Sequence, residues 1–144
     1  MPYPDLLVAP MRADLVRLGF QELRTSDEVD AILGSTRDPV LVVVNSVCGC
    51  AAGAMRPGVA LSLRDAETAP PVLATVFAGQ DLEATNKVRT YLTGYPPSSP
   101  SIALVQDGEP VWMMERHQIE GRGPEAIAQD LKAAYQAHCA STEK

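Results

Sequence analysis

Apolar side chains along this chain alternate between strand-like runs and helical spacing. The clearest strand is the continuous, mostly β-branched run of residues 40–44, which is typical of a strand covered on both faces. Further strands are predicted at residues 20–24, 71–77, 102–106 and 110–114, the last two joined by a hairpin turn at Asp107-Gly108.

Helical spacing marks the segments between these strands. Apolar residues at i, i+4 and i+7 predict a first helix that begins at Pro10 and closes at Gly19. A capping box of Thr25 and Glu28 predicts a second helix that ends at Gly34. A third helix is predicted after Cys50, with a kink or interruption at Arg56-Pro57-Gly58. A fourth is predicted from Asp81, its cap, to Gly94. The last begins near Pro124 and has Ile127, Leu131, Tyr135 and His138 on one face.

The order of these elements indicates the fold class. After the first helix the chain reads β-α-β-α and then β-β-α. The alternating part implies a parallel sheet with helices on both faces, and the hairpin adds antiparallel strands. This order is that of the thioredoxin-like fold, so we expect an α/β protein with three α/β/α layers, a mixed central sheet and an extra N-terminal helix. No repeat or long linker divides residues 1–144, which predicts a single thioredoxin-like domain.

Composition narrows the possible partners. Of the 144 residues 46% are hydrophobic, enough for a core without disulfide or metal staples, and the net charge is −6. That charge argues against nucleic acid and against anionic membranes as partners. The basic pairs Arg12/Arg17 and Lys87/Arg89 are interpreted as ordinary solvated faces. Residues 1–5 do not resemble a signal peptide and no apolar run could span a bilayer, so a soluble, cytoplasmic protein is expected.

The chemistry is expected at Cys48-Gly49-Cys50, two of the three cysteines, which follow the buried strand at a predicted helix start. In a reducing compartment such a pair is more often catalytic or metal-binding than structural. Free N–H groups at a helix start stabilise a thiolate. We therefore expect Cys48 to be the attacking cysteine and Cys50, half a turn further in, to be the resolving one.

The one-residue spacing makes closure of a Cys48–Cys50 disulfide tight, and Gly49 supplies backbone freedom. We expect such a pair to be a poorer protein reductant than a CxxC pair and to act mainly on mixed disulfides. A redox titration that placed its potential well below that of thioredoxin would contradict this hypothesis.

Two other interpretations of the cysteine pair stay open. The thiols could be small buried hydrophobic groups. Alternatively, Cys48, Cys50 and a third ligand could bind zinc or an iron centre, but Cys139 and the two histidines offer no matching spacing, so no metal ligand is predicted.

A proline supports the redox interpretation. Thioredoxin-like folds carry a cis-proline before the strand opposite the active-site helix, and the neighbouring backbone pairs with substrate. Pro100 stands before the apolar segment 102–105, so Ser99, Pro100 and Gly49 are candidate substrate-binding residues. An ordinary trans proline in a loop is the alternative.

At these residues the chain resembles the bacilliredoxin family. The matching stretches lie at residues 42–53 (VVVNSVCGCAAG), 76–81 (VFAGQD), 97–101 (PSSPS), 116–121 (RHQIEG) and 137–139 (AHC). The resemblance implies a thioredoxin-like fold, no bound cofactor, and release of bacillithiol, the low-molecular-weight thiol co-substrate, from S-thiolated client proteins. The resemblance also implies that Cys48 is the nucleophile and that free bacillithiol or Cys50 resolves the mixed disulfide. It further implies that Pro100 is the cis-proline and that a bacillithiol-recycling reductase is a partner. Disulfide isomerase activity is also associated with the family, and a general isomerase or oxidoreductase is the second hypothesis.

Several other residues have two interpretations. Asn45 and Ser46 could bind the thiolate or form the turn, and His117 could be a proton donor or, more simply, a surface residue. Met113 and Met114, beside Trp112, indicate packing. Cys139 is interpreted as a helix-end thiol without a catalytic role, with intermolecular pairing or thiolation as alternatives.

Overall fold

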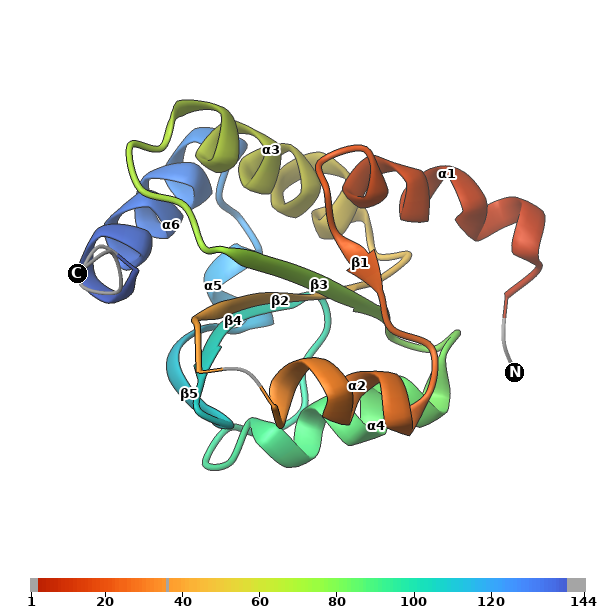
Figure 1. Ribbon diagram of the computed structural model, residues 1–144. Coiled ribbons are helices and arrows are strands. Elements are labelled where there is room, and N and C mark those ends of the chain that lie inside the picture. The colour runs from red at the N-terminus through yellow and green to blue at the C-terminus, as the bar shows by residue number, and fades with distance from the viewer. Residues whose placement is uncertain (1–2, 36, 140–144) are drawn as a thin grey trace.

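A mixed five-stranded sheet forms the middle layer of the molecule (Figure 1). The computed structural model describes residues 3–35 and 37–139. The spatial order of the strands is β1-β3-β2-β4-β5. β1 and β2 lie parallel to β3, whereas β4 is antiparallel to both β2 and β5. The strands are β1 (Gln21–Glu22), β2 (Val40–Asn45), β3 (Val72–Phe77), β4 (Ser101–Gln106) and β5 (Glu109–Met114).

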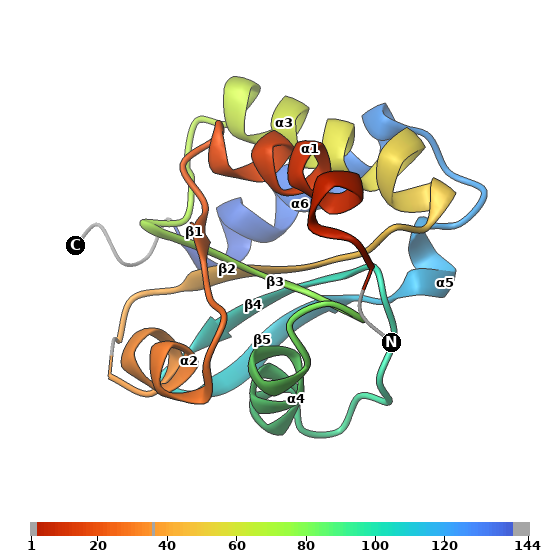
Figure 2. The same cartoon turned by 90° about the vertical axis from the view of Figure 1, so that its right-hand side faces the viewer.

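Helices cover both faces of this sheet, as Figures 1 and 2 show. α1 (Asp5–Val16), α3 (Arg56–Asp65) and α6 (Pro124–His138) lie on one face, and α2 (Ser26–Leu33) and α4 (Leu82–Tyr91) lie on the other. The remaining elements are the π-helical turn η1 (Ala51–Met55) and the short α5 (Arg116–Ile119). The α/β fold class with a mixed sheet is therefore confirmed, and so is the extra N-terminal helix.

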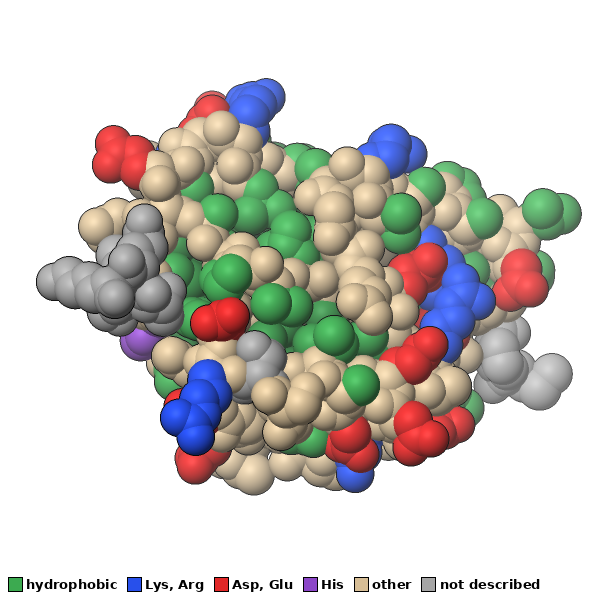
Figure 3. Space-filling model, in the orientation of Figure 1, with side chains coloured by type: hydrophobic (Ala, Val, Ile, Leu, Met, Phe, Trp, Pro, Cys, Tyr) green, Lys and Arg blue, Asp and Glu red, His purple; other side chains and the backbone are tan. Residues whose placement is uncertain are grey.

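The central strand β2 explains how one sheet supports two cores. Its side chains alternate between the faces, and all of its residues are buried. Leu41 and Val43 belong to the core under α1, α3 and α6, whereas Val40, Val42 and Val44 belong to the core over α2 and α4. On the side shown in Figure 3, apolar side chains reach the surface between the two helical layers, and charged side chains lie around them.

The first helix begins earlier than predicted. It starts at Asp5, so Pro10 lies inside the helix and not at its first position. A proline has no N–H for the carbonyl four residues before it, here that of Leu6. Leu6 is 91% exposed, so water can satisfy this carbonyl and the helix continues through Pro10.

The predicted interruption at Arg56-Pro57-Gly58 is wrong, because α3 runs unbroken through these residues, whereas the alternative, a kink there, stays a prediction. The helical segment runs from the cysteine pair to Asp65, and its irregularity is the π-helical turn η1, which lies just before Arg56. There the N–H of Arg56 donates to the carbonyl of Ala51, five residues back. Pro57 lies just after this turn, at the second position of α3.

Local sequence signals at two other places are confirmed. Thr25 and Glu28 form the capping box of α2. Asp107 and Gly108 have positive φ angles of 55° and 78°, as a tight hairpin turn requires. Asp81 precedes α4 as expected, but its side chain makes no capping hydrogen bond, because the carboxylate pairs with Arg12 instead.

Candidate active site at the cysteine pair

The two cysteines lie at the carboxyl end of β2, where the chain turns into the helical segment. Both side chains are half-buried, and their Sγ atoms are 2.8 Å apart, so one thiol donates a hydrogen bond to the other. The N–H groups of Ala51 and Ala52 donate to the carbonyl of Cys48, which begins the helical turn around the sulfur atoms. Cys48 and Cys50 are therefore held in contact before any disulfide forms.

The surroundings shift the pKa values of the two thiols in opposite directions. The pKa of Cys48 is lowered, chiefly because the Cys50 thiol donates a hydrogen bond to its sulfur; the N–H groups of Cys50 and Ala51 and the charge of Arg116 act in the same direction. The pKa of Cys50 is raised, chiefly by burial and then by the hydrogen bond and charge of Cys48. The thiolate is therefore favoured on Cys48 and the thiol on Cys50.

Asn45 and Ser46 shape the turn that leads into this pair. The hydroxyl of Ser46 accepts a hydrogen bond of 2.9 Å from the N–H of Cys48, and Asn45 Oδ1 accepts one of 2.9 Å from the N–H of Ser46. Asn45 Nδ2 donates to the carbonyl of Met11 in α1. These bonds support the turn-forming interpretation of both residues over the thiolate-binding one.

A buried arginine lies behind the same turn. Arg56 is 5% exposed, and its Nη1 donates to Asn45 Oδ1 at 2.9 Å and to the carbonyl of Ser46 at 3.1 Å. Its Nε pairs with Asp14 of α1 at 3.2 Å. Sequence reasoning used Arg56 only as part of a kink, although a cation on the apolar side of a helix was the available signal.

The predicted proline lies at the same end of the sheet as the cysteines, directly before the strand next to β2. The Ser99–Pro100 peptide bond is cis, as expected, and β4 begins immediately afterwards beside β2. Arg116 Nη1 donates to the carbonyl of Ser99 at 3.2 Å. Arg116, whose positive charge lowers the pKa of both cysteines, is thus hydrogen-bonded to Ser99, the residue before Pro100.

An open pocket of about 460 Å³ lies beside Cys48. It brings together Cys48, Ser99, Arg89 and Arg116, which sequence analysis did not combine. Its described lining is Tyr3, Ser46, Val47, Cys48, Ala78, Gly79, Arg89, Ser99 and Arg116. Gly49 does not line it: this residue is exposed between the cysteines, and a Cβ added there would meet no atom within 4 Å.

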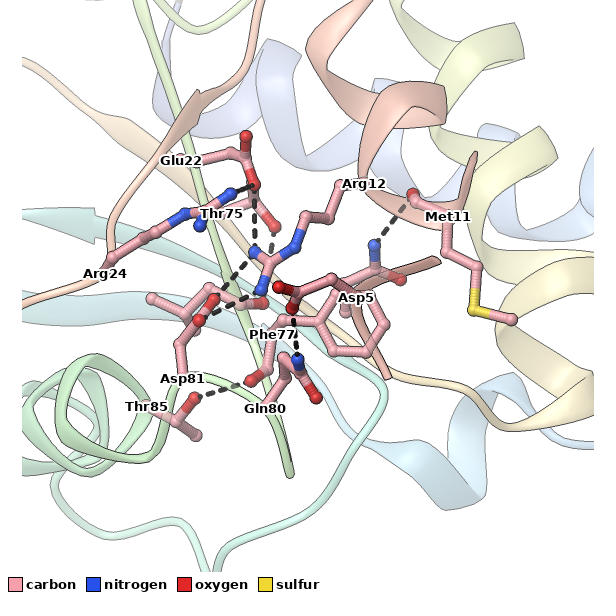
Figure 4. Close-up of polar contacts among 12 residues, drawn as sticks. Asp5, Met11, Arg12, Glu22, Arg24, Thr75, Phe77, Gln80, Asp81 and Thr85 are labelled. Atoms are coloured by element: carbon pink, nitrogen blue, oxygen red, sulfur yellow. Dashed lines mark hydrogen bonds and ion pairs between the residues drawn. The ribbon is translucent and has the colours of Figure 1, made fainter. Parts of the chain in front are cut away.

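The interpretation of the basic pairs as solvated faces is wrong for Arg89 and Arg12. Arg89 is half-buried and faces the pocket just described. Arg12 bonds both carboxylate oxygens of Asp81 at 2.8 and 3.0 Å, pairs with Glu22 at 2.9 Å and lies 5.3 Å from the ring centre of Phe77 (Figure 4). This cluster joins α1 to β1 and to the segment before α4.

The other candidate residues are not among the described residues that line the pocket beside Cys48. His117 is exposed, Met114 is buried beneath α6, and Cys139 is 1% exposed at the end of that helix. Burial raises the pKa of Cys139 to about 11. Within residues 3–35 and 37–139, no group of three or more His, Cys, Asp or Glu side chains could hold a metal ion, and no helix is long and apolar enough to cross a membrane.

Comparison with known proteins agrees with this geometry. A family described as "Disulphide isomerase" matches residues 3–139. A bacilliredoxin of Salinibacter ruber is 54% identical over 99% of this chain and 85% of its own length. Bacilliredoxins of Koribacter versatilis (49% identical) and Geobacillus kaustophilus (48%) match 97% and 96% of the chain and 96% and 98% of their own lengths. The chain belongs to the bacilliredoxin family.

Solved structures confirm the thioredoxin-like fold that this family membership implies. A thioredoxin of Malassezia sympodialis has a TM-score of 0.56 at 12% identity and covers 83% of this chain and 90% of its own. Thioredoxin f2 of Chlamydomonas reinhardtii has a TM-score of 0.56 at 17% identity, with 83% and 96% covered. With bacilliredoxin relatives over nearly its whole length and two thiols in contact, the protein is a thiol–disulfide oxidoreductase.

Proposed function

We propose that this protein removes bacillithiol from S-bacillithiolated client proteins, with Cys48 as nucleophile and Cys50 as resolving cysteine. The observation that carries the proposal is the contact between the two thiols, whose Sγ atoms are 2.8 Å apart. In this contact the pKa of Cys48 is lowered and that of Cys50 is raised. Because the thiolate is the attacking species, the cysteine with the lowered pKa is the one that reacts first. The bacilliredoxin relatives supply the identity of the small thiol.

The reaction consists of two exchanges. The Cys48 thiolate attacks the bacillithiol sulfur of the client disulfide, so that a Cys48–bacillithiol disulfide forms and the client leaves as a thiolate. The Cys50 thiol then loses its proton and attacks the Cys48 sulfur, which releases bacillithiolate and leaves a Cys48–Cys50 disulfide. Free bacillithiolate can attack the mixed disulfide instead, which restores Cys48 and yields bacillithiol disulfide. Either route conserves electrons, since each step breaks one disulfide and forms another.

Three residues are proposed to receive the substrate around these sulfur atoms. Gly49 leaves open space between the cysteines, so a bulky disulfide can approach. Ser99 lines the pocket beside Cys48, and Pro100 precedes the strand next to β2. We infer that the backbone around Ser99 pairs with the client segment that carries the modified cysteine.

Cellular context follows from the same chemistry. A pair that must return to the dithiol form after each turnover requires a reducing compartment, so we propose the cytoplasm as the site of action. The partners proposed are S-thiolated client proteins and a reductase that recycles bacillithiol disulfide.

The test compares single cysteine variants on a client that carries one bacillithiol disulfide. Cys48→Ala is expected to abolish release of bacillithiol, whereas Cys50→Ala is expected to trap a Cys48–bacillithiol adduct that intact-protein mass spectrometry detects. Cys139→Ala is the matched control and should keep the activity of the unaltered chain. If Cys50→Ala is inactive while Cys48→Ala retains activity, the roles are reversed.

A second candidate function is general disulfide isomerisation, which the description of the matching family favours. The two functions differ in their substrates. Bacillithiol release from a client and refolding of a protein with scrambled disulfides are therefore measured with the same preparation. Faster refolding than release would favour the isomerase.

A further inference from the structure

Two arginines from distant segments meet at the pocket beside Cys48. Arg89 comes from α4 and Arg116 from α5, and both line the pocket together with the Cys48 side chain. No acidic side chain is among the described residues that line it. The pocket is therefore a local concentration of positive charge in a chain whose net charge is −6.

The two guanidinium groups have different partners. Arg116 pairs with Glu120 at 3.2 Å and donates to the carbonyl of Ser99, so part of its charge is already compensated. Arg89 is half-buried, and its side chain makes no ion pair or hydrogen bond with the residues that the structure describes. A partly buried guanidinium whose N–H groups have no partner among the described residues can donate hydrogen bonds to an anion.

The neighbouring residues leave room for such an anion. Ala78 and Gly79 line the pocket together with the two arginines, and the pocket has a volume of about 460 Å³. Gly79 has a φ of +82°, a conformation that a larger L-residue would adopt only with strain.

We propose that Arg89 and Arg116 bind an anionic group, a carboxylate, on the small thiol while that thiol is disulfide-bonded to Cys48. The inference rests on the proposed function and adds a substrate class: disulfides whose low-molecular-weight half is anionic. In the step that the pocket favours, the Cys48 thiolate attacks an RS–SR disulfide, a Cys48–SR disulfide forms, and RS⁻ leaves. The R group then lies in the pocket, where a carboxylate on it meets the two arginines.

The experiment uses three symmetrical aliphatic disulfides that differ in charge: dithiodipropionate (anionic), hydroxyethyl disulfide (neutral) and cystamine (cationic). Adduct formation on Cys48 is followed by mass spectrometry in a Cys50→Ala background, so that the adduct persists. Each rate constant is divided by that for the neutral disulfide in the same variant, so that changes in thiolate fraction cancel. The variants are Arg89→Gln, Arg89→Lys, Arg116→Gln and, as control, Arg64→Gln, a 70% exposed arginine that pairs with Asp65.

We expect Arg89→Gln and Arg116→Gln each to lower the anionic-to-neutral ratio by about threefold, the effect of one partly exposed charge pair. Arg89→Lys should retain most of the ratio, Arg64→Gln should leave it unchanged, and added salt should lower it. A ratio that is the same in all variants, or that falls equally in Arg64→Gln, would overturn the assignment of the pocket while leaving thiol exchange intact.

Two further results separate the remaining explanations. A carboxylate could also come from the client, so mixed disulfides of a neutral small thiol with an acidic and with a neutral peptide form a second arm. A preference that follows only the charge of the peptide contradicts the proposal. If no disulfide reacts faster with Cys48 than with a Cys48→Ala chain, the proposed function itself fails.

Discussion

At the scale of single residues, the two cysteines differ because of what surrounds each sulfur. Cys48 receives hydrogen bonds from the Cys50 thiol and from two backbone N–H groups, whereas Cys50 is more desolvated and lies next to the charge of Cys48. Each thiol therefore influences the other, and the pair titrates as a unit. Arg116 favours the thiolate on both cysteines.

The lowered pKa of Cys48 predicts the order of alkylation. The thiolate of Cys48 persists below the ordinary thiol pKa of 9.0 and is lost as the pH falls through the lowered value, so iodoacetamide should label Cys48 first. Cys50→Ala removes the largest stabilising hydrogen bond and should raise the pKa of Cys48, and Arg116→Gln should raise it less. Rates from pH 5 to 10, measured by peptide mass spectrometry, test both expectations.

Cys139 supplies the internal reference for this experiment. Its sulfur is buried and its pKa is raised to about 11, so it should stay unlabelled while the chain is folded. Cys139→Ala should leave the titration of Cys48 unchanged. Labelling of Cys50 before Cys48, or an unchanged Cys48 pKa in Cys50→Ala, would contradict the assignment.

At the scale of elements, the helical segment that follows the cysteines is anchored by the close approach of α3 to α6. Gly58 permits this approach: a Cβ at this position would lie 2.7 Å from Ile127 Cγ2 and 3.1 Å from the carbonyl of Pro124. Because the second of these atoms belongs to the backbone, the contact cannot be relieved by a side-chain rotation alone. The position of the helix that carries the active site thus depends on this glycine.

We predict that Gly58→Ala destabilises the protein by about 2 kcal/mol, the range of overpacked cores. Gly53→Ala is the matched control, because Gly53 lies in the same helical segment and a Cβ there would meet nothing within 4 Å. That variant should be neutral or stabilising by up to about 1 kcal/mol, since alanine favours helix. Urea unfolding followed by circular dichroism measures both; equal effects would contradict the packing explanation.

At the scale of the whole molecule, the N-terminal helix is connected to the sheet by a polar cluster as well as by apolar packing. Arg12 of α1 reaches Glu22 of β1 and Asp81 before α4, as Figure 4 shows. The side chains of Arg12 and Asp81 are only 12% and 11% exposed. Since Asn45 and Arg56 also bind α1, this helix supports the turn before Cys48.

We predict that Arg12→Met lowers the free energy of unfolding by about 3 kcal/mol, because the substitution leaves the Asp81 carboxylate without its partner in a partly desolvated place. Arg64→Met removes an exposed ion pair and should change stability by less than about 1 kcal/mol. Urea unfolding of both variants provides the comparison. Equal stability of the two variants would show that the cluster adds nothing beyond a surface pair.

The sequence by itself determined what depends on short-range interactions. The capping box at Thr25, the turn at Asp107-Gly108 and the buried strand β2 each arise from neighbouring residues, and all three are present. The position of Cys48 between a strand and a helix start is equally local. The element order then restricted the topology to a mixed sheet with two covered faces.

Only the tertiary structure decided which charged residues belong to the site. Arg12, Arg89 and Arg116 occur in helical segments where a solvated face and a buried one produce the same local pattern. Packing of α1 and α3 buried Arg12 and Arg56, and the approach of α4 and α5 to the cysteines brought Arg89 and Arg116 to one pocket. The destination of a long charged side chain depends on contacts between segments far apart in the chain, which no local window of sequence contains.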